Sequence, residues 1–266
     1  MTNLAKLVIL DLNGTLVFRS KSNGSAFRRP YLQSFVNYLF HPSVATANSS
    51  AVPGPPISPG PLQIMVWSSA QPQNVGKMVQ KAFGTKAGSL IAVWDRTHCG
   101  LTEAQYHRKS PTTKDLAKPW KSLAGPHSSK TTVLIDDSVD KAIFQPNNHI
   151  CVIEYTKQCQ LRDLRFMEGG TGEPPYDEML LALVGVLEEM RLQIDVAEWL
   201  RQGGLRQIAS NRTQDEVDTD LVGRFAEMTT EDTSLPWFGN GQVLKFWVTR
   251  GRQTLGHLGI PIRAFN

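Results

Sequence analysis

Short apolar runs recur along the first part of the chain, separated by polar or helix-patterned segments. They read LVILDLNGTLV at 7–17, LQIMVWSSA at 62–70, LIAVW at 90–94, TTVLIDDS at 131–138 and HICVIEY at 149–155. Runs of this length, rich in leucine and β-branched residues, are typical of strands buried on both faces of a parallel sheet. The pattern therefore predicts an α/β fold with a doubly wound, mainly parallel sheet.

The segments between the apolar runs predict helices and two irregular regions. Apolar residues fall at helical spacing in 30–40 and in 73–83, and KDLAKPW at 114–120 opens a short helix. Residues 41–61 are rich in Pro, Ser, Gly and Ala and predict a flexible surface loop. Residues 95–111 are polar and irregular, which indicates a small insert, a cap or flap, after the third strand.

The last third of the sequence predicts helices. Apolar residues recur at helical spacing from 175 to 205, and a further amphipathic piece covers 243–260. We expect an α/β domain over 1–205 and a C-terminal helical extension over 206–266. Four aromatic residues of the extension are expected to dock on their own domain rather than on a partner: Trp237, Phe238, Phe246 and Trp247.

Composition narrows the class of protein. The 266 residues are 41% hydrophobic and 20% charged, which is ordinary for a globular chain. No apolar run approaches the length of a membrane span, and residues 1–10 do not resemble a secretory signal. Three cysteines without CxxC spacing predict free thiols in a reducing compartment, hence a cytoplasmic or nuclear protein.

The charge pattern gives only weak information about partners. The net charge is +4, but the basic residues are scattered among acidic ones and no aromatic-interleaved basic motif is present. We therefore expect no direct nucleic-acid or membrane partner, and the sequence is silent on oligomeric state.

Candidate chemistry lies where the predicted strands end. Asp11 follows the first apolar run, and ligands bind at the carboxyl ends of parallel strands. A carboxylate in that position can attack a phosphoryl group to form an aspartyl phosphate, while a side chain two residues on is placed to handle the proton. In this chain that second residue is an amide, Asn13.

Four segments in this order resemble the motifs of the haloacid-dehalogenase superfamily: DLNGTLV, VWSS, KDL and IDDS. The fuller segments RTHC and IDDSVDKAIFQPNN are similar to the branch of RNA polymerase carboxy-terminal-domain phosphatases, also called the FCP/SCP or NLI-interacting-factor-like branch. The resemblance covers about residues 5–200. It implies a Rossmann-like phosphatase domain that acts on phosphoserine or phosphothreonine in proteins.

The resemblance also implies a magnesium site. Asp11 would be the nucleophile and a magnesium ligand, Asp137 would complete the site, and Asp136 would bind directly or through water. The backbone carbonyl of Asn13 would supply another ligand. Carboxylates, carbonyls and retained waters are the ligands that Mg²⁺ prefers.

The remaining implied roles concern the phosphoryl group. Ser68 would donate a hydrogen bond to it, Lys114 would neutralise the charge that builds on it, and Thr15 would hold the turn after Asp11. Ser69 is left open between phosphate binding and a local bond to the backbone. His98 and Cys99 match the insert pattern, and we expect a structural role for them rather than a metal site.

Asn13 departs from the pattern of the branch, which has an aspartate there as general acid and then general base. An amide can do neither, and general acid–base assistance is worth about a hundredfold to ten-thousandfold in rate. Hydrolysis of the aspartyl phosphate should therefore suffer most. Metal binding is expected to survive, because the backbone ligand is retained.

Three functions follow from this departure. The favoured hypothesis is a magnesium-dependent protein serine/threonine phosphatase, slow or rescued by another proton donor such as Asp136. The alternative is a pseudophosphatase that binds a phosphorylated or acidic peptide. A protein-translocase-type binding subunit of the same branch is a third reading, disfavoured because the chain shows neither an import signal nor an anchor.

Overall fold

A five-stranded parallel sheet forms the centre of the molecule in the computed structural model, which describes residues 4–45, 59–108, 110–167, 176–206 and 236–265. The strand order is β5-β4-β1-β6-β7, and every neighbouring pair is parallel. The strands are β1 (Lys6–Leu10), β4 (Leu62–Trp67), β5 (Ala92–Trp94), β6 (Thr132–Asp136) and β7 (His149–Cys151). This confirms the predicted α/β class and each predicted strand, with shorter ends.

Strand β1 is the central strand, and its five residues are all buried. It pairs with β4 on one side, where Lys6 lies opposite Leu62, and with β6 on the other, where Leu7 lies opposite Thr132. A strand enclosed on both faces and both edges is one whose sequence is continuously apolar, as KLVIL nearly is. Its burial fixes the position of whatever follows it, which is Asp11.

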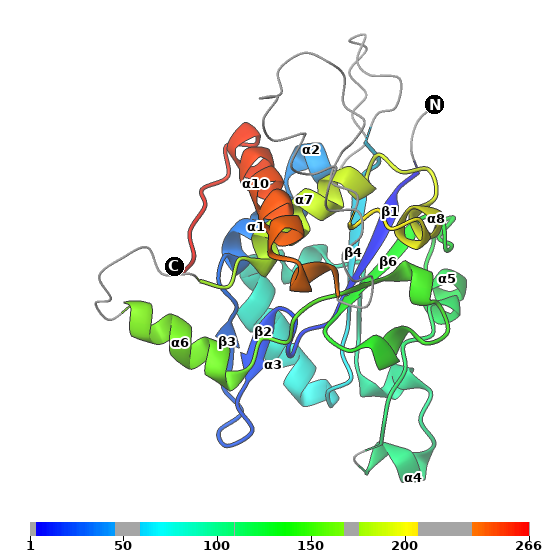
Figure 1. Cartoon of the computed structure of the whole chain (residues 1–266). Helices are drawn as coiled ribbons and strands as arrows, with labels where there is room; N and C mark the ends of the chain where they lie inside the picture. Colours follow the sequence, from blue (N-terminus) through cyan, green and yellow to red (C-terminus); the bar gives the residue numbers. More distant parts are fainter. Residues whose placement is uncertain (1–3, 46–58, 109, 168–175, 207–235, 266) are drawn as a thin grey trace.

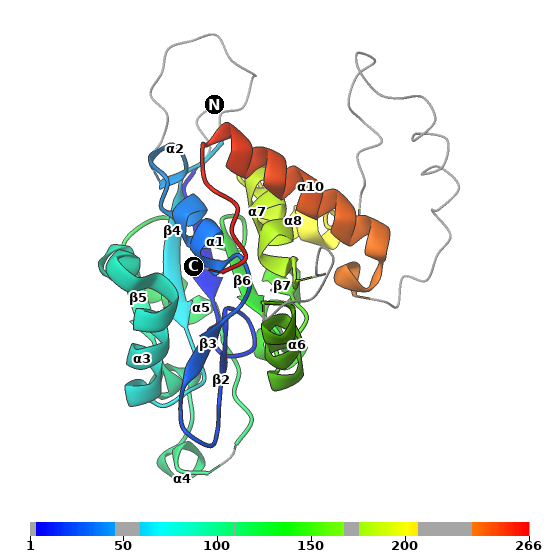
Figure 2. The same cartoon turned by 90° about the vertical axis from the view of Figure 1, so that its left-hand side faces the viewer.

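Helices cover both faces of the sheet (Figures 1 and 2). Val8 and Leu10 face a large apolar core shared with α1 (Leu32–Leu39), α3 (Pro72–Phe83), α7 (Met179–Met190) and α10 (Gly241–His257). Leu7 and Ile9 face a smaller core with the start of α5 (Ala117–Ser122) and with η3 (Val139–Ala142). Successive side chains of β1 therefore pack against helices on opposite faces of the sheet, as in a doubly wound fold.

The predicted helices are present with shifted ends. Helix α1 begins at Leu32, not at Pro30, because Tyr31 before it adopts a left-handed backbone with φ of 62°. Helix α5 begins at Ala117, so Lys114 lies in the segment before it, which has no regular secondary structure. The 175–205 region contains α7 and α8 (Val196–Arg201). The insert contains η2 (Arg96–Cys99) and α4 (Glu103–Tyr106), which projects from the sheet (Figure 1).

Two features were not predicted from the sequence. An antiparallel hairpin of β2 (Val17–Arg19) and β3 (Ala26–Arg28) follows the first turn, and α6 (Lys157–Met167) follows β7. Each hairpin strand has only three residues and is largely half-buried, so no alternation of apolar and polar positions could develop. The remaining short elements are α2 (Pro42–Ala45), η1 (Gly84–Ser89), η4 (Pro146–Asn148) and η5 (Trp237–Gly239).

Helix α10 packs closely along α7 (Figure 2). The two helices meet at Gly185 and Gly251, where a Cβ on either residue would overlap backbone atoms of the other helix. Trp237 and Trp247 are buried in the same core, and the indole N–H of Trp247 donates to the carbonyl of Leu205 at 2.8 Å. Both aromatic residues thus dock on their own chain, while Phe238 and Phe246 are partly buried against the same core.

Some expectations fall outside the described residues. Most of the predicted 41–61 loop does, since 46–58 are not described, and so do residues 207–235 of the extension. The division at residue 205 stays a prediction. Among the described helices, none is both long and apolar enough to cross a membrane.

Candidate active site

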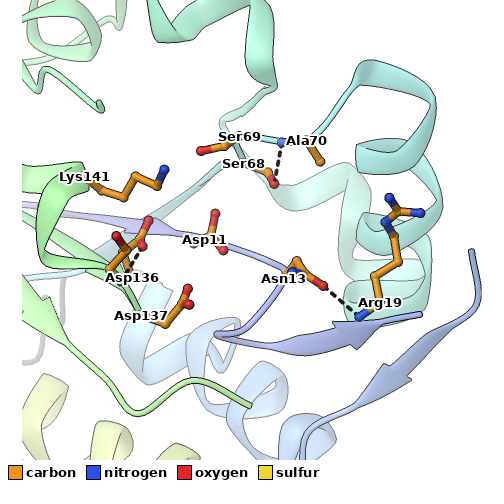
Figure 3. Close-up of a pocket in the computed structure, with 10 residues that line it drawn as sticks. Asp11, Asn13, Arg19, Ser68, Ser69, Ala70, Asp136, Asp137 and Lys141 are labelled. Carbon is orange, nitrogen blue, oxygen red and sulfur yellow. Dashed lines mark hydrogen bonds between the residues drawn. The ribbon is translucent and has the colours of Figure 1, made fainter. Parts of the chain in front are cut away.

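Three adjacent strands deliver polar side chains to one edge of the sheet. Asp11 follows β1, Ser68 follows β4 and Asp136 ends β6, and all three are nearly inaccessible to solvent. They meet in an open pocket of about 360 Å³, shown in Figure 3. The lining residues are Asp11, Asn13, Arg19, Ser68, Ser69, Ala70, Asp136, Asp137, Ser138 and Lys141.

Lys114 lies fully buried beneath this pocket. Its ammonium Nζ donates to Asp11 Oδ1 at 2.7 Å and to Asp136 Oδ2 at 2.5 Å. Burial alone would lower the pKa of Lys114, but the two carboxylates raise it above its usual value, so the side chain is held as a cation. Lys114 joins the nucleophile candidate to Asp136 and is not among the residues that line the pocket.

The carboxyl groups carry more negative charge than Lys114 offsets. Burial raises the pKa of Asp11, Lys114 opposes that shift, and Asp136 and Asp137 add to it. Burial and the nearby Asp136 raise the pKa of Asp137 to about 6. Three neighbouring carboxyl groups around one ammonium make a site that favours an additional cation.

The side chain of Asp137 packs against the turn that follows Asp11. Its side chain lies 2.6 Å from where a Cβ on Gly14 would stand, and Gly14 has a φ of 96°. The positive φ favours glycine at position 14, and a Cβ there would displace the Asp137 carboxylate. Thr15 Oγ1 donates to Asp137 Oδ1 at 3.3 Å, so Thr15 contacts the neighbouring motif as well as belonging to the turn.

The predicted metal ligands have the donor atoms that a hard divalent cation prefers. The predicted set consists of three carboxylates and the carbonyl of Asn13, all oxygen donors of the kind that Mg²⁺ prefers. In the structure, Asp11 and Asp136 accept hydrogen bonds from Lys114. Across the described ranges, no three His, Cys, Asp or Glu side chains lie close enough together to hold a metal ion. Magnesium binding therefore stays a prediction that rests on donor chemistry and excess charge.

Asn13 is fixed by the hairpin that follows it. Its Oδ1 accepts the backbone N–H of Arg19 in β2 at 2.7 Å, as Figure 3 shows. The other end of the amide, Nδ2, makes no hydrogen bond to the part of the chain that is described. An amide in this orientation can offer hydrogen atoms to a ligand but cannot accept a proton from water.

The two serines of the second motif have different partners. Ser68 Oγ accepts the backbone N–H of Ala70 at 3.3 Å, which leaves its own hydroxyl hydrogen able to donate. Ser69 Oγ accepts from Thr112 Oγ1 at 2.9 Å, and Thr112 is buried at the end of the insert. Ser69 therefore forms a hydrogen bond with a side chain that is distant in sequence, and its interactions are not limited to nearby backbone.

His98 and Cys99 do not join the pocket. The His98 ring stacks on Trp94, with centroids 4.7 Å apart, and its Nδ1 accepts from the backbone N–H of Asp95. Cys99 is buried, and its thiol lies beside the Trp67 and Ser69 side chains. These contacts are those of structural residues that shape the start of the insert, as expected.

Five lining or supporting residues were not predicted: Arg19, Ala70, Thr112, Ser138 and Lys141. The backbone N–H of Ser138 donates to Asp136 Oδ1 at 2.9 Å, so both oxygens of Asp136 already accept hydrogen bonds. That engagement disfavours Asp136 as the replacement proton donor. A signal for Lys141 existed in the sequence, since it lies in the motif that carries the Asp136–Asp137 pair.

Comparisons with known proteins show which family this chain is similar to. The family described as NLI interacting factor-like phosphatase matches residues 6–196. An uncharacterized FCP1 homology domain-containing protein of Schizosaccharomyces pombe is 33% identical over 172 residues. That match covers 58% of this chain and 63% of the relative, so the chain spans less than two thirds of the relative's length.

Two solved structures of a phosphatase are among the proteins to which this chain is similar. The fission yeast RNA polymerase II CTD phosphatase Fcp1, bound to beryllium fluoride, is 11% identical with a TM-score of 0.47, covering 82% of this chain and 78% of that one. A second Fcp1 structure is 13% identical with a TM-score of 0.45, covering 87% and 82%.

Proposed function

The chain belongs to the NLI interacting factor-like phosphatase family, and we propose that it transfers phosphoryl groups from protein phosphoserine or phosphothreonine to Asp11. The observation that carries this proposal is the buried Asp11–Lys114–Asp136 arrangement beneath an open pocket. Burying a lysine and two carboxylates costs free energy of folding. The ammonium of Lys114 lies against Asp11, where it could offset the charge of a transferring phosphoryl group. We propose a cytoplasmic or nuclear location and a phosphoprotein or acidic peptide as partner.

Asp11 has one carboxylate oxygen available for attack. Its Oδ1 accepts from Lys114, while Oδ2 accepts no hydrogen bond from the described residues. Attack by Oδ2 on phosphorus forms the aspartyl phosphate and breaks the bond to the seryl or threonyl oxygen, which takes up a proton from water because the Asn13 amide cannot act as an acid. Lys114 keeps Asp11 oriented and offsets its charge, and the Ser68 hydroxyl is placed to donate to a phosphoryl oxygen.

Magnesium fits the donor set, and Asp11, the carbonyl of Asn13, Asp136 and Asp137 would hold it. When bound, the ion would offset negative charge on the transferring group. The excess of carboxylates over Lys114 supports this assignment.

The second half of the reaction should be slow. Hydrolysis requires water to attack phosphorus in the aspartyl phosphate while losing a proton, and the Asn13 amide has no site to take it. The hydrogen bond from Arg19 N–H further occupies the only acceptor of that amide. We therefore propose a phosphatase that accumulates its phosphoenzyme.

The same observation favours one alternative, a pseudophosphatase that binds a phosphorylated or acidic peptide without turning it over. The Nδ2 end of Asn13 can donate to a bound anion, so the pocket suits retention as well as transfer. The two functions differ in whether Asp11 is ever phosphorylated.

Three proteins separate these functions: native, Asp11→Asn and Asn13→Asp. We expect slow magnesium-dependent turnover of an aryl phosphate by the native protein, none by Asp11→Asn, and a gain of about a hundredfold to ten-thousandfold in Asn13→Asp. Equal residual rates in native and Asp11→Asn would exclude the phosphatase. Turnover that appears only in Asn13→Asp would instead support the pseudophosphatase.

A further inference from the structure

A chain of three hydrogen-bonded side chains, Lys141, Thr112 and Ser69, connects the segment that follows β6 to the end of β4. Lys141 Nζ donates to Thr112 Oγ1 at 2.6 Å and to the Thr112 carbonyl at 3.2 Å. Thr112 Oγ1 donates to Ser69 Oγ at 2.9 Å. Lys141 and Ser69 line the pocket, while Thr112 is 4% exposed.

The direction of these hydrogen bonds is fixed by chemistry at one end. An ammonium group has donors and no acceptor, so Thr112 Oγ1 must accept from Lys141. The single hydroxyl hydrogen of Thr112 is then directed to Ser69 Oγ. Ser69 therefore accepts from Thr112, and two acceptors remain for its own hydrogen: the Cys99 thiol, which lies beside the Ser69 hydroxyl, and a ligand in the pocket, which Ser69 lines. A bound anion is the stronger acceptor of the two.

We propose that Lys141 and Thr112 are positioning residues that hold Ser69 as a hydrogen-bond donor to a tetrahedral oxyanion, such as a phosphoryl group. The inference deepens the proposed function, because it assigns further residues to the same pocket. Successive hydrogen bonds polarise one another, and a chain that begins at a cation strengthens the last donor toward an anion. Ser69 would then act beside Ser68, from the same strand end.

The placement of the basic groups supports this assignment. Lys114, the expected partner of the phosphoryl group, is buried against Asp11 and Asp136, and the basic side chains that line the pocket are Lys141 and Arg19. Figure 3 shows these two on opposite sides of Asp11. Lys141 forms no ion pair with a carboxylate of the described chain. Its position is set instead by two contacts. The side chain bonds Thr112, and the backbone carbonyl of Lys141 accepts the backbone N–H of Lys114 at 2.8 Å.

Binding of inorganic phosphate, measured by calorimetry in magnesium buffer, tests the proposal without requiring turnover. Ser69→Ala and Thr112→Val should each weaken binding about tenfold, the effect of losing or misdirecting a hydrogen bond to a charged group. Thr112→Val keeps both the Lys141 charge and the Ser69 hydroxyl, so it tests the connection between them. The double variant should bind no more weakly than Ser69→Ala.

Two further variants distinguish positioning from damage. Thr112→Ser restores the hydroxyl and should restore the native affinity. Thr113→Val is a matched control beside it, since no side-chain hydrogen bond of Thr113 is present in the described structure, and it should bind as the native protein does. Thermal unfolding of each variant checks that the fold is intact.

Several results would overturn the inference. Native affinity in Thr112→Val, no rescue by Thr112→Ser, or additive losses in the double variant would each show that Ser69 does not depend on Lys141 and Thr112. Failure of the native protein to bind phosphate would remove the anion site itself. Phosphate binding with the expected pattern, together with no turnover and no phosphorylated Asp11, would retain this inference and contradict the proposed transfer.

Discussion

Two regions of the molecule are buried to a similar degree but for opposite physical reasons. Beneath the pocket, Lys114, Asp11 and Asp136 are buried charges held by hydrogen bonds. At the junction of α7 and α10, Gly185 and Gly251 are buried because two helix backbones pack against each other. Burial of charge costs free energy, whereas burial of apolar helix faces supplies it. The comparison indicates which region serves function and which serves stability.

The largest effect is expected where the buried charges lose their balance. Lys114→Met leaves Asp11 and Asp136 without their cation, and removing one partner of a buried ionic group costs about 3–5 kcal/mol of unfolding free energy. The variant should also lose turnover. Urea unfolding at pH 7.5 and the aryl phosphate assay measure the two losses.

Lys121→Met in α5 is the matched control for that variant. Lys121 is exposed, and it makes no ion pair with the described residues. Its replacement should leave both stability and turnover near native values. A Lys114→Met protein as stable as this control would contradict the account of the buried charges.

A smaller effect is expected at the helix junction. Gly251→Ala forces a Cβ against the backbone of Leu181 in α7, and overpacking of this kind costs about 1–3 kcal/mol. Turnover per folded molecule should be unchanged, because the residue lies outside the pocket. Unfolding curves and active-site titration of the folded fraction test both statements, and a stable variant with lost turnover would break the contrast between the regions.

The smallest effect, of opposite sign, is expected one turn further along the same helix. A Cβ at Gly256 would meet nothing within 4 Å, and α10 continues to His257. Gly256→Ala should therefore stabilise the protein by about 0.5–1 kcal/mol, the usual gain from replacing a helical glycine. Destabilisation by this variant would show that α10 packs differently near its end.

Sequence patterns predicted the part of the molecule that is locally encoded. The apolar runs that end in Asp11, Ser68 and Asp136 are β1, β4 and β6, and their adjacency in a parallel sheet brings the three side chains together. Lys114 was predicted as a site residue from the resemblance. The complete burial of Lys114 between two carboxylates could not be predicted from the sequence, because it depends on packing between distant segments.

The residues that sequence reasoning missed act through long-range contacts. Thr112 and Lys141 are 29 positions apart, and Thr112 and Ser69 are 43 apart, so no spacing rule connects them. The packing of α10 on α7 is equally non-local, since it depends on two glycines in separate helices. Such contacts follow from the tertiary fold rather than from any periodic pattern.

The most direct test of the central claim is a pre-steady-state burst experiment, with substrate in excess over enzyme, that traps the phosphoenzyme. Native protein is mixed with aryl phosphate and magnesium, the released phenol is followed in time, and the protein is acid-quenched for mass spectrometry. A burst of phenol equal to the enzyme concentration is expected, followed by a much slower steady rate, with phosphate on Asp11. Asn13→Asp should show faster steady turnover and less trapped phosphate. No burst and no modified Asp11 in the native protein would contradict the account.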